Sequence, residues 1–381
     1  MRNPFKPTAG AEPPYLIGRE SSLESFIEGL QDGPGSPGLL SLITGPRGIG
    51  KTALLHRSEK FAKEYGWAVV SETATPGLLA RIGSSVDEHL KRPGEGRSGR
   101  KVTGLHAAGF GITAELTPEE QVSLRRRLTD LVTRLAERHQ TGVLITVDEI
   151  HSADRAELTQ LAATVQHLIR ESLPIALIGA GIPKAVSDLL NDEVTTFLRR
   201  ADPIVLADVQ ISAVRGSLER TFEETSVGIS AEHLDQAATA TGGYPFLIQL
   251  VGYHVWRFSK DAGHVTEESL ERGIEAARRR LGSTVLATSL ADLSDVDKTF
   301  LLKMALDAAP TRLTDIADRM GRERRYVSVY RKRLIDAGVI RSAGRGYVEF
   351  AVPHLAEHLR EHAAQLHEPG LRSTDESAQP T

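Results

Sequence analysis

Residues 39–52 read L-L-S-L-I-T-G-P-R-G-I-G-K-T. The first six form an apolar run that predicts a buried strand, and residues 51–65 predict a helix. Between them, residues 45–52 match G-x-x-x-x-G-K-[ST], the phosphate-binding P-loop, whose glycines let backbone N–H groups face an anion. A plain glycine-rich turn is the less favoured interpretation in this strand–loop–helix context. The predicted nucleotide-binding residues are Gly45, Pro46, Arg47, Gly48, Ile49, Gly50, Lys51 and Thr52.

Two acidic residues follow a second apolar run. Residues 143–147 read V-L-I-T-V and lead directly into Asp148 and Glu149. The C-terminal end of a buried parallel strand lies at the sheet edge where ligands bind, although a solvated acidic turn is the alternative. We expect Thr52 and Asp148 to hold Mg²⁺ and Lys51 to reach the β- and γ-phosphates of ATP. Glu149 would orient and deprotonate water, so the predicted activity is hydrolysis of ATP to ADP and phosphate.

Short apolar runs alternate with amphipathic stretches around these two motifs. Further strands are expected at residues 67–71, 175–178 and 204–206, and a long amphipathic helix at residues 124–135. This alternation predicts an α/β fold, in which helices cover both faces of a parallel sheet. With the P-loop at the end of one strand, the prediction is a P-loop NTPase sheet.

Composition limits the class of protein. The chain has 381 residues, enough for two or three domains, and it has no cysteine, which excludes disulfides, thiol nucleophiles and Cys-based metal sites. No run of about 18 apolar residues occurs, so we expect no transmembrane helix and no membrane partner. The N-terminal segment lacks the apolar core of a signal peptide, so a cytoplasmic location is predicted.

The character of the sequence changes several times along the chain. We predict a flexible arm at 1–14, a P-loop ATPase domain at 15–209 with an insertion at about 91–117, a helical lid at 210–282, a winged helix-turn-helix at 291–352, and a C-terminal helix with a disordered tail at 353–381. The arm and the tail are rich in proline and polar residues, which is typical of segments that form no core.

The winged-helix prediction rests on charge and on the order of elements. Residues 310–350 carry ten Lys or Arg against five Asp or Glu, whereas the whole chain has a net charge of −4. Helices are expected at residues 295–306, 313–320 and 323–337, and a β ribbon at residues 339–341 and 347–352. Helix, helix, basic helix and ribbon is the order of a winged helix-turn-helix.

The third of these helices has two distinct faces. Val327, Tyr330 and Leu334 share one face and are expected to pack in the core. The opposite face and the tip of the ribbon are basic, which favours insertion into the major groove of double-stranded DNA. The predicted DNA-binding residues are Arg324, Arg325, Ser328, Lys332 and Arg345. Contact with a protein is the alternative, because a fold alone does not fix function.

Together these motifs resemble those of the AAA+ and STAND ATPases, most closely the branch with the origin-recognition and cell-division-control ATPases. The resemblance covers residues 15–352. Residues 15–20, Y-L-I-G-R-E, resemble the N-terminal box of the family, which implies that Ile17, Gly18 and Arg19 lie beside the adenine. Residues 241–245, T-G-G-Y-P, resemble the G-x-P motif of STAND lids, which implies nucleotide contacts for Gly243, Tyr244 and Pro245.

The resemblance also bears on the rate of hydrolysis. Arg199 and Arg200 stand where the family places an arginine finger, which implies catalysis on a neighbouring subunit and hence self-association; a surface ion pair is the alternative. Residues 174–181, P-I-A-L-I-G-A-G, end without the polar residue that senses the γ-phosphate in the family. We therefore expect slow hydrolysis.

The function implied by the resemblance is a molecular switch that binds ATP with Mg²⁺, hydrolyses it slowly, and binds double-stranded DNA through its winged helix. The alternative is a STAND-type signalling or scaffold ATPase whose winged helix binds protein. A translocating helicase is the least favoured class, because the sequence carries no second motor domain.

Overall fold

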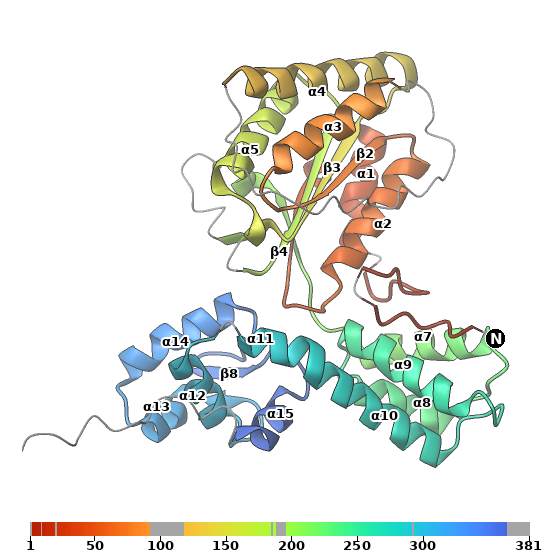
Figure 1. Cartoon of the computed structure of the whole chain (residues 1–381), viewed down its shortest axis with the longest axis vertical. Helices are drawn as coiled ribbons and strands as arrows, with labels where there is room; N and C mark the ends of the chain where they lie inside the picture. The colour runs from red at the N-terminus through yellow and green to blue at the C-terminus, as the bar shows by residue number, and fades with distance from the viewer. Residues whose placement is uncertain are drawn as a thin grey trace, which may run out of the picture. The chain divides into compact units, whose positions relative to one another are not determined.

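The computed structural model describes residues 2–8, 10–19, 21–91, 118–183, 186–187, 196–291 and 293–363. It divides into two compact units, Met1–Ala277 and Arg278–Thr381, which are taken separately below (Figure 1). The predicted insertion, apart from its first residue, and the predicted tail beyond residue 363 lie outside the described residues. Within the described ranges, no helix is both long and apolar enough to cross a membrane.

The first unit is built around a sheet of five parallel strands. They are β1 (Leu40–Thr44), β2 (Ala68–Thr73), β3 (Val143–Asp148), β4 (Ile175–Gly181) and β5 (Asp202–Val205). Their spatial order is β2-β3-β4-β1-β5, so β4 lies between β1 and β3. The five predicted strands are confirmed, with ends that differ by at most three residues.

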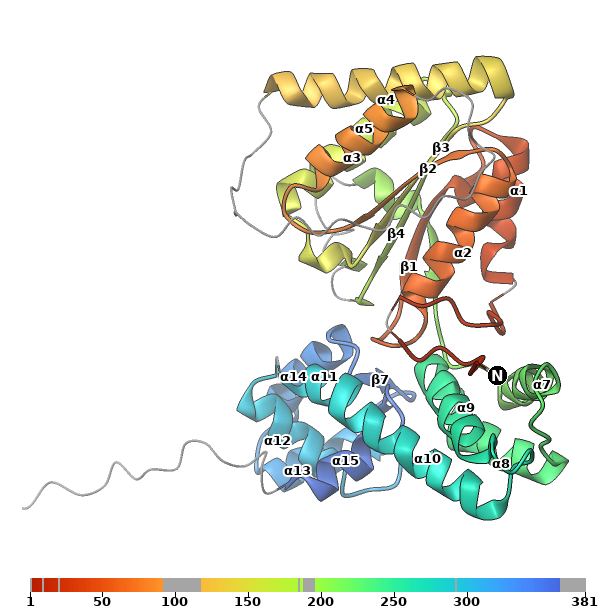
Figure 2. The ribbon, with the colours of Figure 1, turned by 45° about the vertical axis from the view of Figure 1, so that its right-hand side comes forward.

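Helices cover both faces of this sheet, as Figures 1 and 2 show. On one face lie α1 (Glu24–Asp32) and α2 (Lys51–Glu64); on the other lie α3 (Leu78–Lys91), α4 (Pro118–His139) and α5 (Arg155–Arg170). Short 3₁₀ turns are η1 (Ser21–Leu23), η2 (Pro37–Leu39), η3 (Ile150–Ser152) and η4 (Thr196–Arg200). The predicted α/β fold with a parallel P-loop sheet is confirmed.

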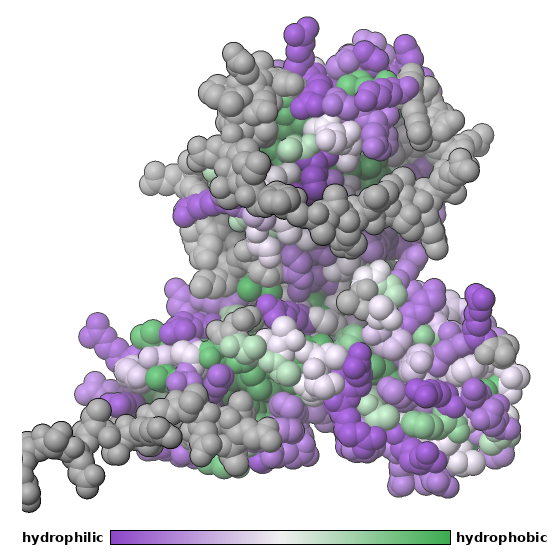
Figure 3. Space-filling view, in the orientation of Figure 1, coloured by the Kyte–Doolittle hydropathy of each residue, from purple (hydrophilic) through white to green (hydrophobic). Residues whose placement is uncertain are grey.

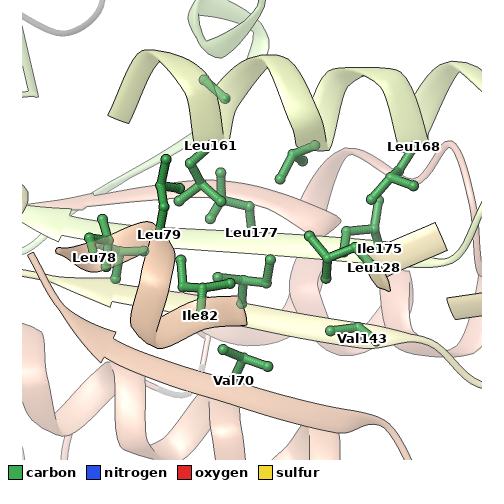
Figure 4. Close-up of a cluster of buried hydrophobic side chains, with 14 of the residues drawn as sticks. Val70, Leu78, Leu79, Ile82, Leu128, Val143, Leu161, Leu168, Ile175 and Leu177 are labelled. Atoms are coloured by element: carbon green, nitrogen blue, oxygen red, sulfur yellow. The ribbon is translucent and has the colours of Figure 1, made fainter. Parts of the chain in front are cut away.

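The main core of this unit lies between the strands and helices α3, α4 and α5 (Figure 4). The apolar face predicted for the α4 region is confirmed, since Leu124, Leu128, Leu131 and Val132 are buried. Figure 3 shows mainly hydrophilic side chains over the outer surface of α4. Each fully buried leucine contributes about 1.5–3 kcal/mol to the free energy of folding. This packing stabilises the sheet whose C-terminal edge carries the site.

Four helices follow the sheet and occupy the region predicted as the lid. They are α7 (Ile211–Glu223), α8 (Ala231–Ala240), α9 (Pro245–Ser259) and α10 (Glu267–Leu281). Ser230 caps α8 by accepting from the His233 N–H at 3.1 Å, and Pro245 takes the first position of α9, where its missing N–H costs nothing. We call these four helices and their connections the lid.

The N-terminal arm packs against the lid, which corrects one prediction. Phe5 is only 3% exposed, and its ring centroid lies 5.5 Å from that of Phe222 in α7. A Cβ at Gly252 would overlap the Phe5 ring, so this glycine of α9 provides the space for it. The prediction of a flexible arm is therefore wrong at Phe5. Composition alone does not show that a helix far along the chain leaves space for one aromatic ring of the arm.

The second unit combines helices with a small antiparallel sheet. After the π-helical turn η5 (Gly282–Leu286), its helices are α11 (Ala287–Ala291), α12 (Asp295–Met304), α13 (Leu313–Met320), α14 (Arg324–Asp336) and α15 (Leu355–Glu361). Its strands β6 (Thr311–Arg312), β7 (Ile340–Ser342) and β8 (Tyr347–Phe350) pair in the order β6-β8-β7. The helices and the ribbon predicted at residues 295–352 are present, and β6 is an additional strand.

A buried carboxylate fixes α14 in this unit. Ser294 and Asp297 form a capping box at the start of α12. Asp297 is 1% exposed, and its Oδ2 accepts from Arg333 Nη2 of α14 at 2.9 Å. Because a buried charge is tolerated only when it is paired, this bond holds α14 in a defined position against α12.

Candidate nucleotide-binding site

The P-loop connects β1 to α2 at the C-terminal edge of the sheet. Gly48 and Gly50 have φ angles of 74° and 98°, values that L side chains rarely adopt. Gly50 is the N-cap of α2 and has no side chain to accept from the first N–H groups of the helix. These N–H groups and the helix dipole favour an anion such as a phosphate at this point.

Lys51 lies within the loop rather than in solvent. Its side chain is buried, and Nζ donates to the carbonyls of Gly45 at 3.0 Å and Pro46 at 2.9 Å. Burial lowers the pKa of Lys51, and the nearby carboxylates of Glu149 and Asp148 oppose that effect. A phosphate would give this desolvated ammonium a fully charged partner, as the P-loop prediction requires.

The two predicted metal ligands meet in the structure. Thr52 Oγ1 donates to Asp148 Oδ2 at 2.6 Å. Thr52 follows β1 and Asp148 ends β3, and β4 lies between these two strands in the sheet. The other oxygen, Asp148 Oδ1, accepts from the Glu149 N–H at 2.8 Å. A hydroxyl and a carboxylate are the hard oxygen donors that Mg²⁺ prefers, so the residues fit the predicted cation.

Glu149 adopts a backbone conformation that its sequence does not reveal. Its φ is 53° and its ψ is 45°, in the left-handed region. The turn places Ile150 in the core, directly against Gly181 of β4, where a Cβ would lie only 2.6 Å from the Ile150 side chain. It leaves Glu149 partly exposed at the sheet edge. Non-glycine residues in this conformation are concentrated at functional sites, which agrees with the predicted role of Glu149.

The N-terminal box contacts protein groups around the P-loop. Arg19 is 8% exposed, and its Nη2 donates to the carbonyls of Ile49, at 3.4 Å, and Ala207. Gly18 has a φ of 62°, and a Cβ there would lie 3.3 Å from Val209. The box therefore joins the P-loop to the segment between β5 and the lid. Glu20, the last residue of the box, lies outside the described residues.

A cavity of about 630 Å³ opens beside this box, between α1, α2 and α7. Ile17, Gly18 and Arg19 line it on one side and Ala53, directly after the P-loop, on another. Its size lies within the range of small-molecule sites. Its position next to the P-loop is suitable for the nucleoside part of a nucleotide whose phosphates lie in the loop.

The lid motif reaches the P-loop through its tyrosine. Tyr244 is completely buried, and its hydroxyl donates to the Arg47 carbonyl. Burial raises the pKa of this hydroxyl, and the Asp208 carboxylate adds to the effect. The Gly243 carbonyl accepts from the Val209 N–H at 2.8 Å, and Pro245 begins α9. The structure thus brings the box, the P-loop, the acidic pair and the lid motif together.

Comparison with known families agrees with this geometry. Residues 15–178 match the family model described as an AAA ATPase domain. We refer to this part of the chain, which is similar to that family, as the AAA domain. Residues 283–359 match a second family model, described as a domain of unknown function, and a search of curated proteins finds no match.

Solved structures share the fold of the AAA domain and of the rest of the chain. The Walker-type ATPase PABY2304 of Pyrococcus abyssi is 17% identical, with 91% of this chain and 96% of that chain covered and a TM-score of 0.65. The ORC2 protein of Aeropyrum pernix is 16% identical, with 94% and 96% covered and a TM-score of 0.61. Cdc6p of Pyrobaculum aerophilum is 16% identical, with the same coverage and a TM-score of 0.51. At these identities the likeness establishes the fold.

Two further predictions for the AAA domain have different outcomes. All seven residues of β4 are buried, and the strand ends at Gly181, in agreement with the missing polar residue. Arg199 and Arg200 are exposed on η4, directly before β5. Their proposed action on a neighbouring subunit stays a prediction.

The predicted DNA-binding residues lie on the surface of the second unit. Arg324, Arg325, Ser328 and Lys332 are exposed on α14, and Arg345 is exposed between β7 and β8. On the opposite side of α14, the core prediction is confirmed for Val327 and Leu334, which are buried. It is wrong for Tyr330, which is half-buried beside the exposed Tyr326 with ring centroids 5.0 Å apart.

One buried polar group near the AAA site was not anticipated. Glu59 of α2 is 8% exposed, and its Oε1 accepts from Ser71 Oγ of β2 at 2.6 Å and Thr146 Oγ1 of β3 at 2.7 Å. It ties the P-loop helix to the strand that ends in Asp148. The signal in the sequence is a glutamate four residues after Leu55, on the face of α2 that also buries Leu54 and Ala62.

Proposed function

We propose that this protein is an ATP-dependent switch that binds ATP in its AAA domain, hydrolyses it slowly, and binds double-stranded DNA through its second unit. The observation that carries the ATP part is the 2.6 Å hydrogen bond from Thr52 Oγ1 to Asp148 Oδ2. It unites the two motifs that ATP and Mg²⁺ require, at the edge of the sheet where the P-loop lies.

Binding of ATP uses groups that are already in place. The backbone N–H groups after Gly48 and the N-terminus of α2 would hold the phosphates. Lys51 Nζ would exchange its carbonyl partners in the loop for phosphate oxygens, which are stronger acceptors. The cavity beside the N-terminal box would take the adenosine. The Aeropyrum pernix ORC2 protein was solved as ADPNP and ADP complexes, which supports this proposal at the level of the fold.

Hydrolysis would depend on the acidic pair. Bound Mg²⁺ supplies charge neutralisation for the phosphates, and Thr52 and Asp148 are the residues that would hold it. Glu149, partly exposed one residue further, would orient water and accept its proton. The absence of a polar side chain at the end of β4 favours slow turnover, unless Arg199 or Arg200 of another copy completes the site.

DNA binding is assigned to the second unit. Its helices α12, α13 and α14 followed by the β7–β8 hairpin have the order of a winged helix-turn-helix. The exposed basic face of α14 would enter the major groove, where arginine can read guanine, and Arg345 would contact the backbone. Movement of the lid between the ATP and ADP states would alter this binding.

Titration of fluorescent duplex DNA at two salt concentrations, with ADP or a non-hydrolysable ATP analogue, tests the proposal. The double variant Arg325→Ala, Lys332→Ala should bind more weakly and reduce the salt slope by about two. A charge-matched control, Lys60→Ala with Arg138→Ala on exposed positions of the AAA domain, should bind as the wild type. Equal affinity with both nucleotides would refute the switch, and no binding in either state would refute the DNA assignment.

A second candidate is a STAND-type signalling ATPase whose second unit binds protein. Val329 on the basic face of α14 is 57% exposed, and a protein partner would cover this apolar side chain whereas the DNA backbone would not. This candidate predicts nucleotide binding without salt-dependent affinity for DNA, so the same titration separates the two.

A further inference from the structure

Side chains from different parts of the chain donate to P-loop carbonyls: Arg19 of the N-terminal box holds the Ile49 carbonyl, and two other donors hold the carbonyls at the start of the loop. Lys51, from the loop itself, donates to the carbonyls of Gly45 and Pro46. The next carbonyl, that of Arg47, accepts from the hydroxyl of Tyr244 in the lid. Three successive carbonyls are thus held by two side chains, and only one of these is a group that phosphate would attract.

Tyr244 has little freedom in this position. Its side chain is completely buried, and a Cβ on Gly48 would overlap its hydroxyl, so the tyrosine lies directly against the P-loop backbone. Gly243 has a φ of 77°, and a Cβ there would overlap the carbonyl of Val209. The lid motif is therefore packed between the P-loop and the segment that leads from β5 into α7.

We propose that Tyr244 is a positioning residue for nucleotide binding: its hydroxyl fixes the Arg47–Gly48 peptide of the P-loop to the lid, so that occupation of the loop and the position of the lid are coupled. The inference rests on the proposed ATP site and deepens it. When phosphate draws Lys51 away from the first two carbonyls, the bond from Tyr244 still holds the third. The loop keeps its shape, and the lid is the element that holds it.

The energetic basis is the cost of leaving buried polar groups without partners. If the lid moves off the loop, the buried Tyr244 hydroxyl and the partly buried Arg47 carbonyl lose the bond between them. Removing the hydroxyl alone deletes this bond, and we expect it to change nucleotide release by about tenfold. The ring would still fill its space, so the fold is preserved.

The first test is release of a fluorescent ADP analogue, followed by stopped flow for the wild type and two variants. Tyr244→Phe should release the nucleotide about tenfold faster, with an association rate within about twofold of the wild type. Tyr253→Phe, the same substitution on α9 of the lid, should release it at the wild-type rate. Equal release by wild type and Tyr244→Phe would overturn the inference, whereas a wild type that binds no nucleotide would overturn the proposed ATP site and this inference with it.

The second test separates coupling from simple loss of stability. The chain has two tryptophans, Trp67 and Trp256, and Trp256 is buried in α9. In a Trp67→Phe background, a saturating non-hydrolysable ATP analogue should change the emission of Trp256. Adding Tyr244→Phe should abolish this change although nucleotide still binds. A variant that melts earlier but keeps the full change in emission would show a merely structural role and overturn the inference.

Discussion

The P-loop and helix α14 carry the two halves of the proposed function, and they are built in opposite ways. At the P-loop the functional groups are backbone amides and buried side chains, with Lys51 5% and Tyr244 0% exposed. On α14 the groups proposed to bind DNA are the exposed side chains of residues such as Arg325 and Lys332. In the P-loop, packing and hydrogen bonds hold the functional groups in place. On α14, the fold only positions the helix, and its exposed side chains are not held by neighbours in the same way.

This difference determines what can be concluded about each region. A curled loop with a buried ammonium and a nearby carboxylate accepts few ligands other than a phosphate with its cation. An exposed basic helix is compatible with DNA, with an acidic protein, or with solvent alone. Substitutions at the P-loop should therefore abolish function, whereas substitutions on α14 should redirect or weaken it.

The largest expected effect is the loss of nucleotide binding in Lys51→Ala. The substitution removes the cation from the loop, and we expect affinity for ATP to fall by at least about 100-fold, from the loss of charge-assisted hydrogen bonds. Calorimetric titration measures it, with Lys60→Ala, an exposed lysine of the same helix, as the control. If Lys51→Ala bound ATP with wild-type affinity, the buried ammonium would not be needed for the ligand. The P-loop would then determine its ligand no more closely than the exposed face of α14 does.

The next effect separates binding from hydrolysis. Glu149→Gln removes the proposed base but keeps the side-chain volume, so we expect turnover to fall by about 100- to 1,000-fold while ATP affinity stays within about threefold. Phosphate release under saturating ATP measures turnover, and Glu137→Gln on the exposed side of α4 is the matched control. Unchanged turnover would move the role of base to another group.

The motifs of the P-loop site could be predicted because their chemistry depends on local sequence. Gly50 and Lys51 stand at fixed positions between a strand and a helix, and the apolar run before Asp148 predicts a buried strand end. The same local logic predicts the strands of the sheet and the helices of the second unit. Spacing and periodicity are sufficient in these cases.

The contacts that join the motifs could not be predicted, because they depend on tertiary packing. Nothing near residue 244 indicates that its hydroxyl meets the Arg47 carbonyl. The insertion of Phe5 beside Gly252 and the left-handed turn at Glu149 are likewise decided by neighbours far along the chain or by the need to bury Ile150. The sequence identifies the parts of the site, and the packing determines how they are coupled.

A smaller effect tests how much the hydrogen bonds of Glu59, which join α2 to β2 and β3, stabilise the P-loop region. Glu59→Leu would leave the buried hydroxyl of Thr146 and the more exposed hydroxyl of Ser71 without their acceptor, and we expect the AAA domain to lose about 1–3 kcal/mol of unfolding free energy. Urea unfolding followed by tryptophan fluorescence measures the loss. Thr146→Val removes one donor together with its need for a partner and should cost about 1 kcal/mol or less. If both variants were neutral, the buried network would contribute nothing to the rigidity that distinguishes the P-loop from α14.

The smallest effect concerns the scaffold beneath α14. Arg319 donates to both oxygens of Asp307, at 2.8 and 2.6 Å, and these bonds lower the pKa of Asp307. A carboxyl whose pKa is lower in the folded state stabilises the fold above its unfolded pKa, about 4, and loses this contribution as the pH falls through the folded value. Because the pair is partly exposed, we expect less than about 1 kcal/mol.

Hydrogen exchange of α13 in the wild type and Asp307→Asn, compared at the same pH, measures this contribution. The wild type should be better protected at pH 6, and the difference should vanish at pH 2, while Asp318→Asn at an exposed site of α13 should match the wild type at both. A difference that persists at pH 2 would mean that Asp307 acts through packing rather than charge. The interior of the second unit would then be held by packing rather than by charge, and the contrast with the P-loop would be confined to the exposed surface of α14.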